Sequence, residues 1–188
     1  MEFGDNIIFM NGFEQEFVAQ SKSFLLDDFL VKIERAVNKM TDEQIWWRAG
    51  DESNGVGNLL LHLAGNVRQW IVSGIGGAPD NRFRQGEFDE RNQISGAELL
   101  ANLRNAVEEA CSVLEKLNAD DLLENRSIQG RDTTLLSAIY HVTEHFAMHA
   151  GQIIFIAKMF AGDMKFYEDA GGLAIPNWRR PDKDRAAF

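Results

Sequence analysis

Apolar residues recur three or four positions apart in four long stretches of the chain. These stretches run from about Phe13 to Met40, Asn58 to Ser73, Gly96 to Leu117 and Thr133 to Phe160. Such spacing places the apolar side chains on one face of a helix, which can then pack against its neighbours. The pattern predicts four long amphipathic helices and little strand. We therefore expect an all-α fold, a four-helix bundle of the up-down kind.

Polar residues at two helix starts support these boundaries. Thr41-Asp42-Glu43-Gln44 and Ser95-Gly96-Ala97-Glu98 have the form of a capping box, in which a hydroxyl is followed three residues later by an amide or carboxylate. Asn11 is a candidate cap for the first helix. The signal at Thr41 predicts a short helical turn that carries Trp46 and Trp47.

The connections between the predicted helices are long, which leaves room for crossovers. Residues 78–94 are polar and charged without periodicity, and this predicts a functional or mobile loop. Residues 127–131 can form a small hairpin or an irregular loop. Glycine and proline after Gly162 predict an irregular C-terminal tail. We expect one domain, with the bundle over residues 1–162 and the tail over 163–188, packed on or extending from it.

Composition and charge exclude several classes of protein. The 188 residues suit one domain. There are 19 Lys+Arg and 29 Asp+Glu, a formal net charge of −10 that repels the nucleic-acid backbone, so no nucleic-acid partner is expected. No apolar run approaches the roughly 18 residues that span a membrane. A single cysteine and an amino terminus without a signal-peptide pattern predict a soluble cytoplasmic protein.

The four histidines are the strongest chemical signal in the sequence. His141, His145 and His149 lie four apart on the predicted fourth helix, so neighbours in this row can converge on one ion. The outer two are separated by about 12 Å of helix rise and cannot share it. A second helix must supply the next ligand, and His62 is the only other histidine. Three imidazoles and one open position are typical of catalytic zinc or a similar divalent metal.

Two alternatives stay open on these residues. The histidine row can be structural or sense pH, and His62 lies on a polar stripe that can simply face solvent. His141 to His145 also match H-x-x-E-H, the inverted zinc-peptidase signature, with Glu144 as general base. Such peptidases need a larger domain and a further acidic ligand. Glu144 points about 100° away from His145, so we expect it on a solvated face.

Two segments of the chain resemble the DinB/YfiT-like family of metal-dependent four-helix proteins. They are Gly57-Asn58-Leu59-Leu60-Leu61-His62-Leu63-Ala64-Gly65-Asn66 and His141-Val142-Thr143-Glu144-His145-Phe146-Ala147-Met148-His149-Ala150-Gly151-Gln152-Ile153. In that family, one histidine of the second helix and two of an H-x-x-x-H, followed by a small or basic residue, Gly and Gln, hold the metal. The resemblance implies these metal ligands: His62, His145 and His149.

The resemblance covers roughly Phe13 to Gly162 and leaves the tail unexplained. It makes His141 a neighbour that can hydrogen-bond a ligand rather than bind the metal. The chain departs from the family at Ala150, where a basic residue is common, and at Met148, where a second histidine is common. Neither departure removes a ligand, but both lie where members of the family differ in substrate.

The resemblance also implies a reaction. Characterised relatives include thiol S-transferases and isomerases that use low-molecular-weight thiols such as bacillithiol or mycothiol, and a metal with an open site can present a thiolate to an electrophile. Hydrolysis by metal-bound hydroxide is the other reaction. We expect zinc or nickel as the metal, with manganese or iron as further candidates. The expected partners are a small-molecule substrate, with a low-molecular-weight thiol as the candidate, and a second copy of the chain in a homodimer. The competing class is a non-catalytic metal-binding or interaction protein.

Few other residues receive a role from the sequence, and no catalytic or cofactor-binding residue is assigned. Gln152, three residues after His149, is placed to touch the site. Cys111 is expected to be a buried, inert thiol, and the tryptophans are expected to pack in the core or a dimer interface. Four arginines can bind carboxylates of a thiol cofactor but are left as surface charge: Arg68, Arg82, Arg84 and Arg91.

Overall fold

The computed structural model describes residues 12–91 and 94–178, and over these residues the fold is mainly helical, as the sequence predicts. The expected cap Asn11 lies outside the described residues. The first long helical rod is made of α1 (Phe13–Ser23), a π-helical stretch (Phe24–Phe29) and α2 (Leu30–Val37). The other long rods are α4 (Val56–Val67) with a π-helical continuation (Arg68–Ser73), α6 (Gly96–Leu114) and α7 (Leu135–Phe160).

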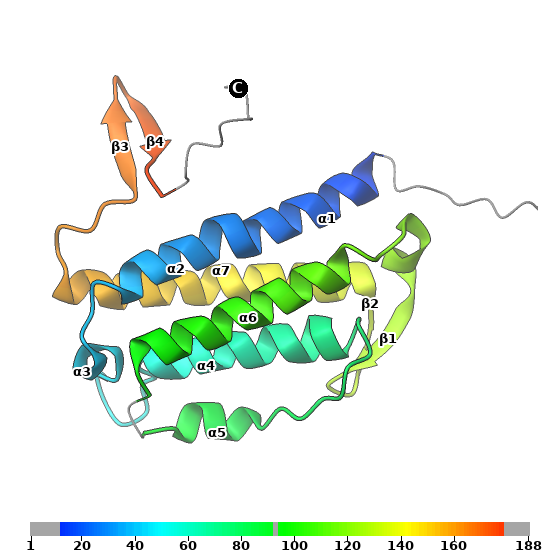
Figure 1. Cartoon of the computed structure of the whole chain (residues 1–188), viewed down its shortest axis with the longest axis horizontal. Helices are drawn as coiled ribbons and strands as arrows, with labels where there is room; N and C mark the ends of the chain where they lie inside the picture. Colours follow the sequence, from blue (N-terminus) through cyan, green and yellow to red (C-terminus); the bar gives the residue numbers. More distant parts are fainter. Residues whose placement is uncertain (1–11, 92–93, 179–188) are drawn as a thin grey trace, which may run out of the picture.

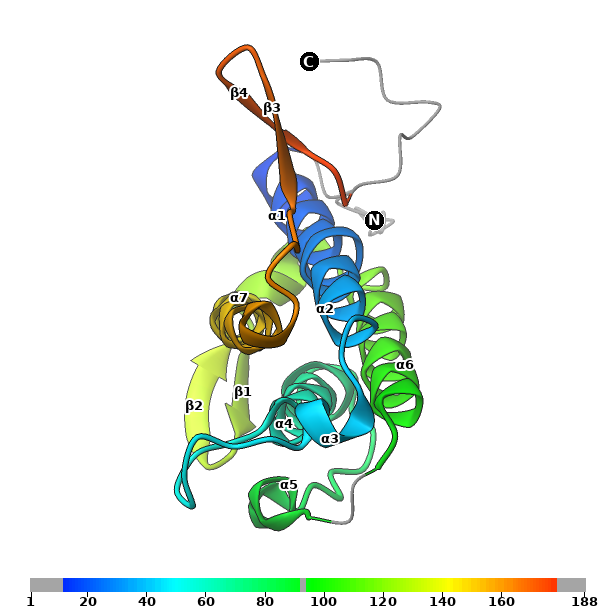
Figure 2. The same ribbon diagram turned by 90° about the vertical axis from the view of Figure 1, so that its left-hand side faces the viewer.

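These four rods surround one apolar core. Seen nearly end-on in Figure 2, α2, α6, α4 and α7 lie around a common centre, and α4 packs against both α6 and α7. Each rod contributes side chains at the predicted helical spacing, and Phe146 of α7 is fully buried. The apolar residues at the centre include Leu25, Ile33, Leu60, Leu63, Leu103, Val107, Ile139 and Ile153.

Hydrogen bonds at the helix starts confirm the predicted capping boxes. Thr41 and Gln44 form one at the start of the short helix α3 (Asp42–Ile45), and Ser95 and Glu98 form the other at the start of α6. The second long helix begins two residues before the predicted Asn58. Its start is stabilised because the Asn58 side chain accepts a hydrogen bond from the Gly55 amide at 3.2 Å.

The helices α4 and α6 start at the same end of the molecule, so they run parallel. The indole of Trp46 links the two starts, because it donates to the Ile94 carbonyl at 2.8 Å and its ring lies against Gly57. A Cβ on Gly57 would come within 2.8 Å of that ring. The connection from α4 to α6 therefore runs back along the body, as Figure 1 shows. The simple up-down order is wrong for this pair, and a crossover replaces it.

The crossover contains a short helix where the sequence predicts an unstructured loop. This helix, α5 (Arg84–Asp89), is too short to show periodicity, and contacts with α4 hold it in place. The fully buried Asn58 amide donates to the carbonyls of Glu87 at 2.9 Å and Glu90 at 3.2 Å. These bonds satisfy carbonyl groups that a helix end otherwise leaves without partners.

Two β-hairpins complete the described chain. The hairpin of β1 (Asn125–Ile128) and β2 (Arg131–Thr134) is one of the two alternatives considered for residues 127–131. The second hairpin, β3 (Tyr167–Ala170) and β4 (Leu173–Pro176), corrects the prediction of an irregular tail.

The tail hairpin turns at two glycines and rests on buried aromatic residues beside it. Gly171 and Gly172 both have positive φ angles, as a two-residue hairpin turn requires. The strands themselves are exposed, so they lack the alternation that would have predicted them. Phe166 and Trp178, on either side of the hairpin, are buried against the helical body. No helix in the described part of the chain has the length and apolar character needed to cross a membrane.

Candidate metal centre

Three of the four histidines meet between α4 and α7. His62 comes from the middle of α4 and is 4% exposed, while His145 and His149 lie one turn apart on α7. The Nε2 atom of His145 is 3.1 Å from Nε2 of His62 and 3.2 Å from Nε2 of His149. One ligand atom of each ring lies within 4.8 Å of the other two. The three imidazoles named by the family resemblance are therefore brought together.

The donor set and its spacing are compatible with a divalent metal. A zinc–nitrogen bond of about 2.0–2.1 Å at tetrahedral angles separates neighbouring nitrogens by about 3.4 Å. The two Nε2–Nε2 distances from His145, 3.1 Å to His62 and 3.2 Å to His149, are close to this separation. Imidazole nitrogen suits zinc, nickel, copper and iron, so the donor atoms alone do not select one metal.

The environment keeps two of these imidazoles neutral, which is the form that binds a metal. Burial lowers the pKa of His145 to about 3, and the neighbouring imidazoles of His149, His62 and His141 and the charge of Arg82 act in the same direction. The pKa of His149 is also lowered by burial, partly offset by its hydrogen bond with Gln152. At neutral pH neither ring needs to lose a proton before it can act as a ligand.

Glu87 and Arg82 from the crossover complete the centre, and the sequence analysis missed both roles. Glu87 Oε2 lies 2.9 Å from Nδ1 of His62, and Arg82 donates to both oxygens of the same carboxylate at 2.7 and 2.8 Å. Burial would raise the pKa of Glu87. The hydrogen bonds and charges of Arg82 and His62 outweigh that effect and lower its pKa, so the group is a carboxylate at neutral pH.

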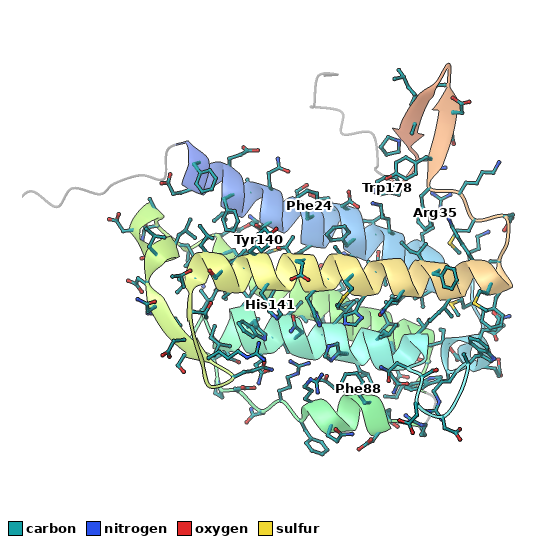
Figure 3. The ribbon with its side chains drawn as sticks, turned by 180° about the vertical axis from the view of Figure 1, so that it is seen from behind. Phe24, Arg35, Phe88, Tyr140, His141 and Trp178 are labelled. Carbon is teal, nitrogen blue, oxygen red and sulfur yellow. The ribbon has the colours of Figure 1, made fainter. Side chains whose placement is uncertain are left out.

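The Glu87 carboxylate determines the direction of the His62 ring. Because a carboxylate only accepts, Nδ1 of His62 carries the proton and Nε2 keeps its lone pair toward the other histidines. Arg82 Nη2 also lies 3.1 Å from Nδ1, but its hydrogens are taken by Glu87 Oε2 and the His62 carbonyl. Phe88 covers the His62 ring, with ring centres 4.8 Å apart, on the side of α5 that faces α4 in Figure 3.

Gly65 makes room for this ion pair. A Cβ at that position would collide with Glu87 Oε1 and come within 2.8 Å of Arg82 Nε. The sequence offers one hint, a glycine three residues after His62 in the middle of the predicted helix. Arg82 and Glu87 lie in a polar stretch without periodicity, and nothing in that stretch indicates which of its charged residues meets His62.

The residues near the ligands lie as the helix geometry predicts. Gln152 contacts the centre, with its Oε1 at 2.7 Å from Nδ1 of His149, so Nε2 of His149 is left to face His145. Glu144 is exposed, as expected, and is not placed to act as the base of an inverted zinc peptidase. His141 lies tilted against Trp70, with ring centres 4.4 Å apart, and its ring centre is 5.6 Å from that of His145. It forms no hydrogen bond with the three candidate ligands, which is the contact that the resemblance allowed, and Nδ1 of His145 has no partner.

Two cavities lie on either side of Arg82. One, of about 540 Å³, is next to the histidines and is lined by His62, His141 and His145 among others. The other, of about 620 Å³, lies between α4, the crossover and α6, and no histidine lines it. Of the two, only the smaller cavity has both candidate metal ligands and arginines in its wall.

Cysteine and tryptophan have the structural roles that the sequence predicts. Cys111 is 6% exposed, and burial raises the pKa of its thiol to about 11, which leaves it protonated and unreactive at neutral pH. Trp46, Trp70 and Trp178 pack against the core, whereas Trp47 is partly exposed and meets the edge of Phe160.

Comparisons with known proteins give a family and a fold. A family model described as a protein of unknown function, DUF1572, matches residues 13–170. A DinB-like protein from Bacillus cereus ATCC 10987 is 16% identical, with a TM-score of 0.60 over 77% of this chain and 91% of that chain. A DinB-like protein from Bacillus subtilis is 15% identical, with a TM-score of 0.59 over 86% of this chain and 99% of that chain. No curated protein matches. At these identities the solved structures show a shared fold only.

Proposed function

The chain belongs to the DUF1572 family and folds as DinB-like proteins do, and from this premise we propose that it is a metal-dependent enzyme with His62, His145 and His149 as ligands. The resemblance to the DinB/YfiT-like family is thereby confirmed. The observation that carries the proposal is the convergence of the three Nε2 atoms from two helices.

The partners of the histidines support a ligand role over an ordinary buried role. His62 and His149 each engage a side-chain oxygen through Nδ1, which leaves Nε2 directed at the cluster. This is the pattern by which neighbouring groups orient metal ligands. Without a metal, the Nε2 lone pairs of His62 and His149 would depend on a single proton on Nε2 of His145, which can serve only one of them at a time. The other lone pair would be left without a donor, which is costly in a buried site.

The number of ligands favours an enzyme over a structural site. In the part of the chain that the structure describes, the cluster contains these three histidines and no fourth cysteine, histidine or carboxylate. Glu87 is nearby but is engaged with the outer nitrogen of His62. Structural zinc sites are usually closed by four protein ligands, whereas catalytic sites keep one position open. The non-catalytic metal-binding protein is therefore the second candidate.

Thiol transfer to a small-molecule electrophile is the reaction that we assign first, and hydrolysis is the second. A divalent metal with an open position would lower the pKa of a thiol or a water bound to it. The chain itself would contribute the orientation of His62 by Glu87, the orientation of His149 by Gln152 and the shielding of His62 by Phe88. Zinc and nickel are the first metals to test, followed by manganese and iron. No general base is assigned.

The remaining assignments concern architecture and partners. We class the four rods as a four-helix bundle with a crossover, and residues 163–178 as part of the same domain, because Met164, Phe166 and Trp178 join its core. Exposed Met148, Phe155 and Met159 form a stripe on α7, which supports a homodimer. A cytoplasmic location and the absence of nucleic-acid and membrane partners remain expectations from composition.

The metal content of protein purified without chelator or nickel resin tests the proposal. The native chain should hold about one divalent ion, as a three-histidine site requires. His62→Ala, His145→Ala and His149→Ala should lose it, and the matched control His141→Ala should retain it. If the native chain is purified without metal and also does not bind added zinc, nickel or manganese, the proposal is wrong and the histidines have a structural role.

A cobalt-substituted sample separates the two candidate functions. An open site should change its cobalt(II) spectrum when a small thiol is added, because the thiol takes the free position. A closed site should not respond. A spectrum that is unchanged at saturating thiol would reject the transferase and leave hydrolysis or a structural metal.

A further inference from the structure

The cavity beside the histidines is lined with positive charge and with no carboxylate. Arg82 from the crossover, Arg84 from the start of α5 and Arg131 from the start of β2 all line it, and no aspartate or glutamate does. The protein as a whole has a formal net charge of −10. Three arginines from two separate segments therefore meet at one cavity of about 540 Å³ in an acidic protein.

Two of these arginines have no acceptor within the described residues. The Arg84 guanidinium lies over the face of Phe88, at 4.8 Å from the ring centre, and neither its side chain nor that of Arg131 forms a hydrogen bond or ion pair with a described residue. Both residues are exposed. Arg82, by contrast, is committed to Glu87. Every other arginine in residues 12–91 and 94–178 donates to an oxygen: Arg35, Arg48, Arg68, Arg91, Arg104 and Arg126.

Buried N–H groups without partners lie in the same cavity wall. Trp70, 4% exposed, has no acceptor for its indole Nε1, and Nδ1 of His145 is also buried without a partner. If Nε2 of His145 binds a metal, Nδ1 carries the proton and is a donor. Buried donors in native proteins are nearly always paired with protein, water or ligand. The residues that line the cavity therefore include two arginines whose side chains have no acceptor among the described residues, and two residues with a buried nitrogen that has no partner.

We propose that this cavity binds the oxyanion end of the small-molecule substrate or co-substrate, a carboxylate or a phosphate, through Arg84, Arg131, Trp70 and His145. The inference rests on the proposed function, because the donor state of His145 follows from its Nε2 serving as a ligand. Arginine binds both oxyanions through paired N–H donors. The rest of the molecule then extends toward His62, and Asn66, whose buried Oδ1 has no donor, can accept from a hydroxyl or amine on it.

Calorimetric titration with three probes tests the inference. Succinate carries carboxylates without a thiol, 2-mercaptosuccinate adds a thiol to the same skeleton, and inorganic phosphate presents the other oxyanion. Each is titrated into metal-free and zinc-loaded protein. At least one oxyanion should bind, and the tighter of succinate and phosphate identifies the group that the cavity accepts.

Paired variants assign the binding to this cavity. The double variant Arg84→Gln/Arg131→Gln should bind the probe about tenfold or more weakly than the native chain, because two charge-assisted contacts are lost. Trp70→Phe keeps an aromatic side chain but removes the indole N–H, so it should weaken binding of the probe by a smaller factor. Arg126→Gln is the matched control, since Arg126 lies on the neighbouring strand, pairs with Glu124 and does not line the cavity. The affinity of the Arg126→Gln variant for the probe should match that of the native chain.

The outcomes separate this inference from the proposed function. Succinate or phosphate binding that depends on Arg84 and Arg131 supports the inference even when the protein binds no metal, because neither probe has a thiol that would need one. Metal binding together with no oxyanion binding overturns the inference and leaves the metal centre intact. Binding that is equally strong in the double variant also overturns it. If 2-mercaptosuccinate binds more tightly than succinate only in the zinc-loaded protein, one ligand occupies the metal and the cavity at the same time, which supports the inference.

Discussion

At His62, one ring nitrogen faces two other imidazoles and the opposite nitrogen is bonded to a carboxylate. That carboxylate, Glu87, is held in turn by two hydrogen bonds from Arg82. A lone imidazole can bind a metal through either nitrogen, and Glu87 removes this choice by fixing the proton on Nδ1. At the scale of the residue, the ligand and the residue that orients it come from segments 25 positions apart in the chain.

Glu87→Gln should weaken the binding of metal without unfolding the protein. The amide has the same shape but carries no charge, so it polarises His62 less and leaves Arg82 without its ion pair. Loss of such an orienting partner typically lowers metal affinity about 10–100-fold. The affinity is measured by competition with a chromophoric chelator. Glu115→Gln, which removes an exposed carboxylate paired with Lys22, is the control. Equal affinities in both variants would deny Glu87 a positioning role.

At the scale of the element, the position of α5 depends on one face of α4. Asn58 binds the backbone of the crossover, His62 binds its carboxylate, and Gly65 leaves space for the ion pair. These residues lie three or four positions apart, so they share one stripe of α4. The short helix would have little stability alone, and this stripe supplies the contacts that hold it.

Gly65→Ala should displace α5 and disturb the metal centre. The added Cβ collides with the Glu87 carboxylate, so the ion pair must move away from His62. We expect metal affinity to fall about tenfold or more through the loss of that orienting contact. Gly151→Ala is the matched control, because a Cβ on this helical glycine of α7 has open space and should stabilise the helix by about 0.5–1 kcal/mol. Unchanged affinity in Gly65→Ala would contradict the expectation.

The tail hairpin contributes to stability through Trp178 rather than through its strands. The Trp178 ring packs against Phe166 and Tyr167, and Lys32 Nζ lies 3.9 Å from its centre. Trp178→Ala should therefore lower the free energy of unfolding by about 3 kcal/mol, as core aromatic truncations do. Leu173→Ala, at an exposed position of β4, should change it by less than about 0.5 kcal/mol. Urea unfolding of both variants compares the two, and equal losses would reject this packing role.

At the scale of the whole molecule, buried titratable groups make stability depend on pH. In the unfolded chain His145 takes up a proton near its ordinary pKa of 6.5, but in the folded chain it does so only near pH 3. Between these values the unfolded state holds more protons, so stability falls as the pH falls. The lowered pKa values of His149, His141 and Glu87 act with the same sign. Cys111 acts at the alkaline end, where its raised pKa removes stability above pH 9.

The metal-free protein should therefore lose stability on mild acidification. Its free energy of unfolding in urea should be lower at about pH 5.5 than at about pH 7.5, because the imidazoles resist protonation only when folded. His145→Gln removes the group with the largest shift among these and should show a shallower dependence on pH. Parallel pH dependences for the native chain and this variant would show that His145 is not the source.

The long helices, the capping boxes at Thr41 and Ser95, and the row of histidines on α7 follow from local rules that the sequence displays. Helical spacing determines which side chains share a face, so His145 and His149 had to be neighbours wherever α7 packed. His62 was the candidate ligand from a second helix because it is the only other histidine. The choice of His145 and His149 over His141 came from a family resemblance, because spacing alone does not say which turn of α7 faces the other helix. The buried thiol of Cys111 was predictable from its apolar neighbours on α6.

Only the tertiary structure decided the parallel order of α4 and α6, the position of α5, the tail hairpin and the residues around the histidines. These residues lie in a loop or in short elements whose conformation depends on distant contacts such as the one from Asn58: Arg82, Arg84, Glu87 and Arg131. Periodicity reports the face that a helix buries, since it repeats within the helix itself. It carries no information about which other segment covers that face, because that choice is made by contacts between residues far apart in the chain.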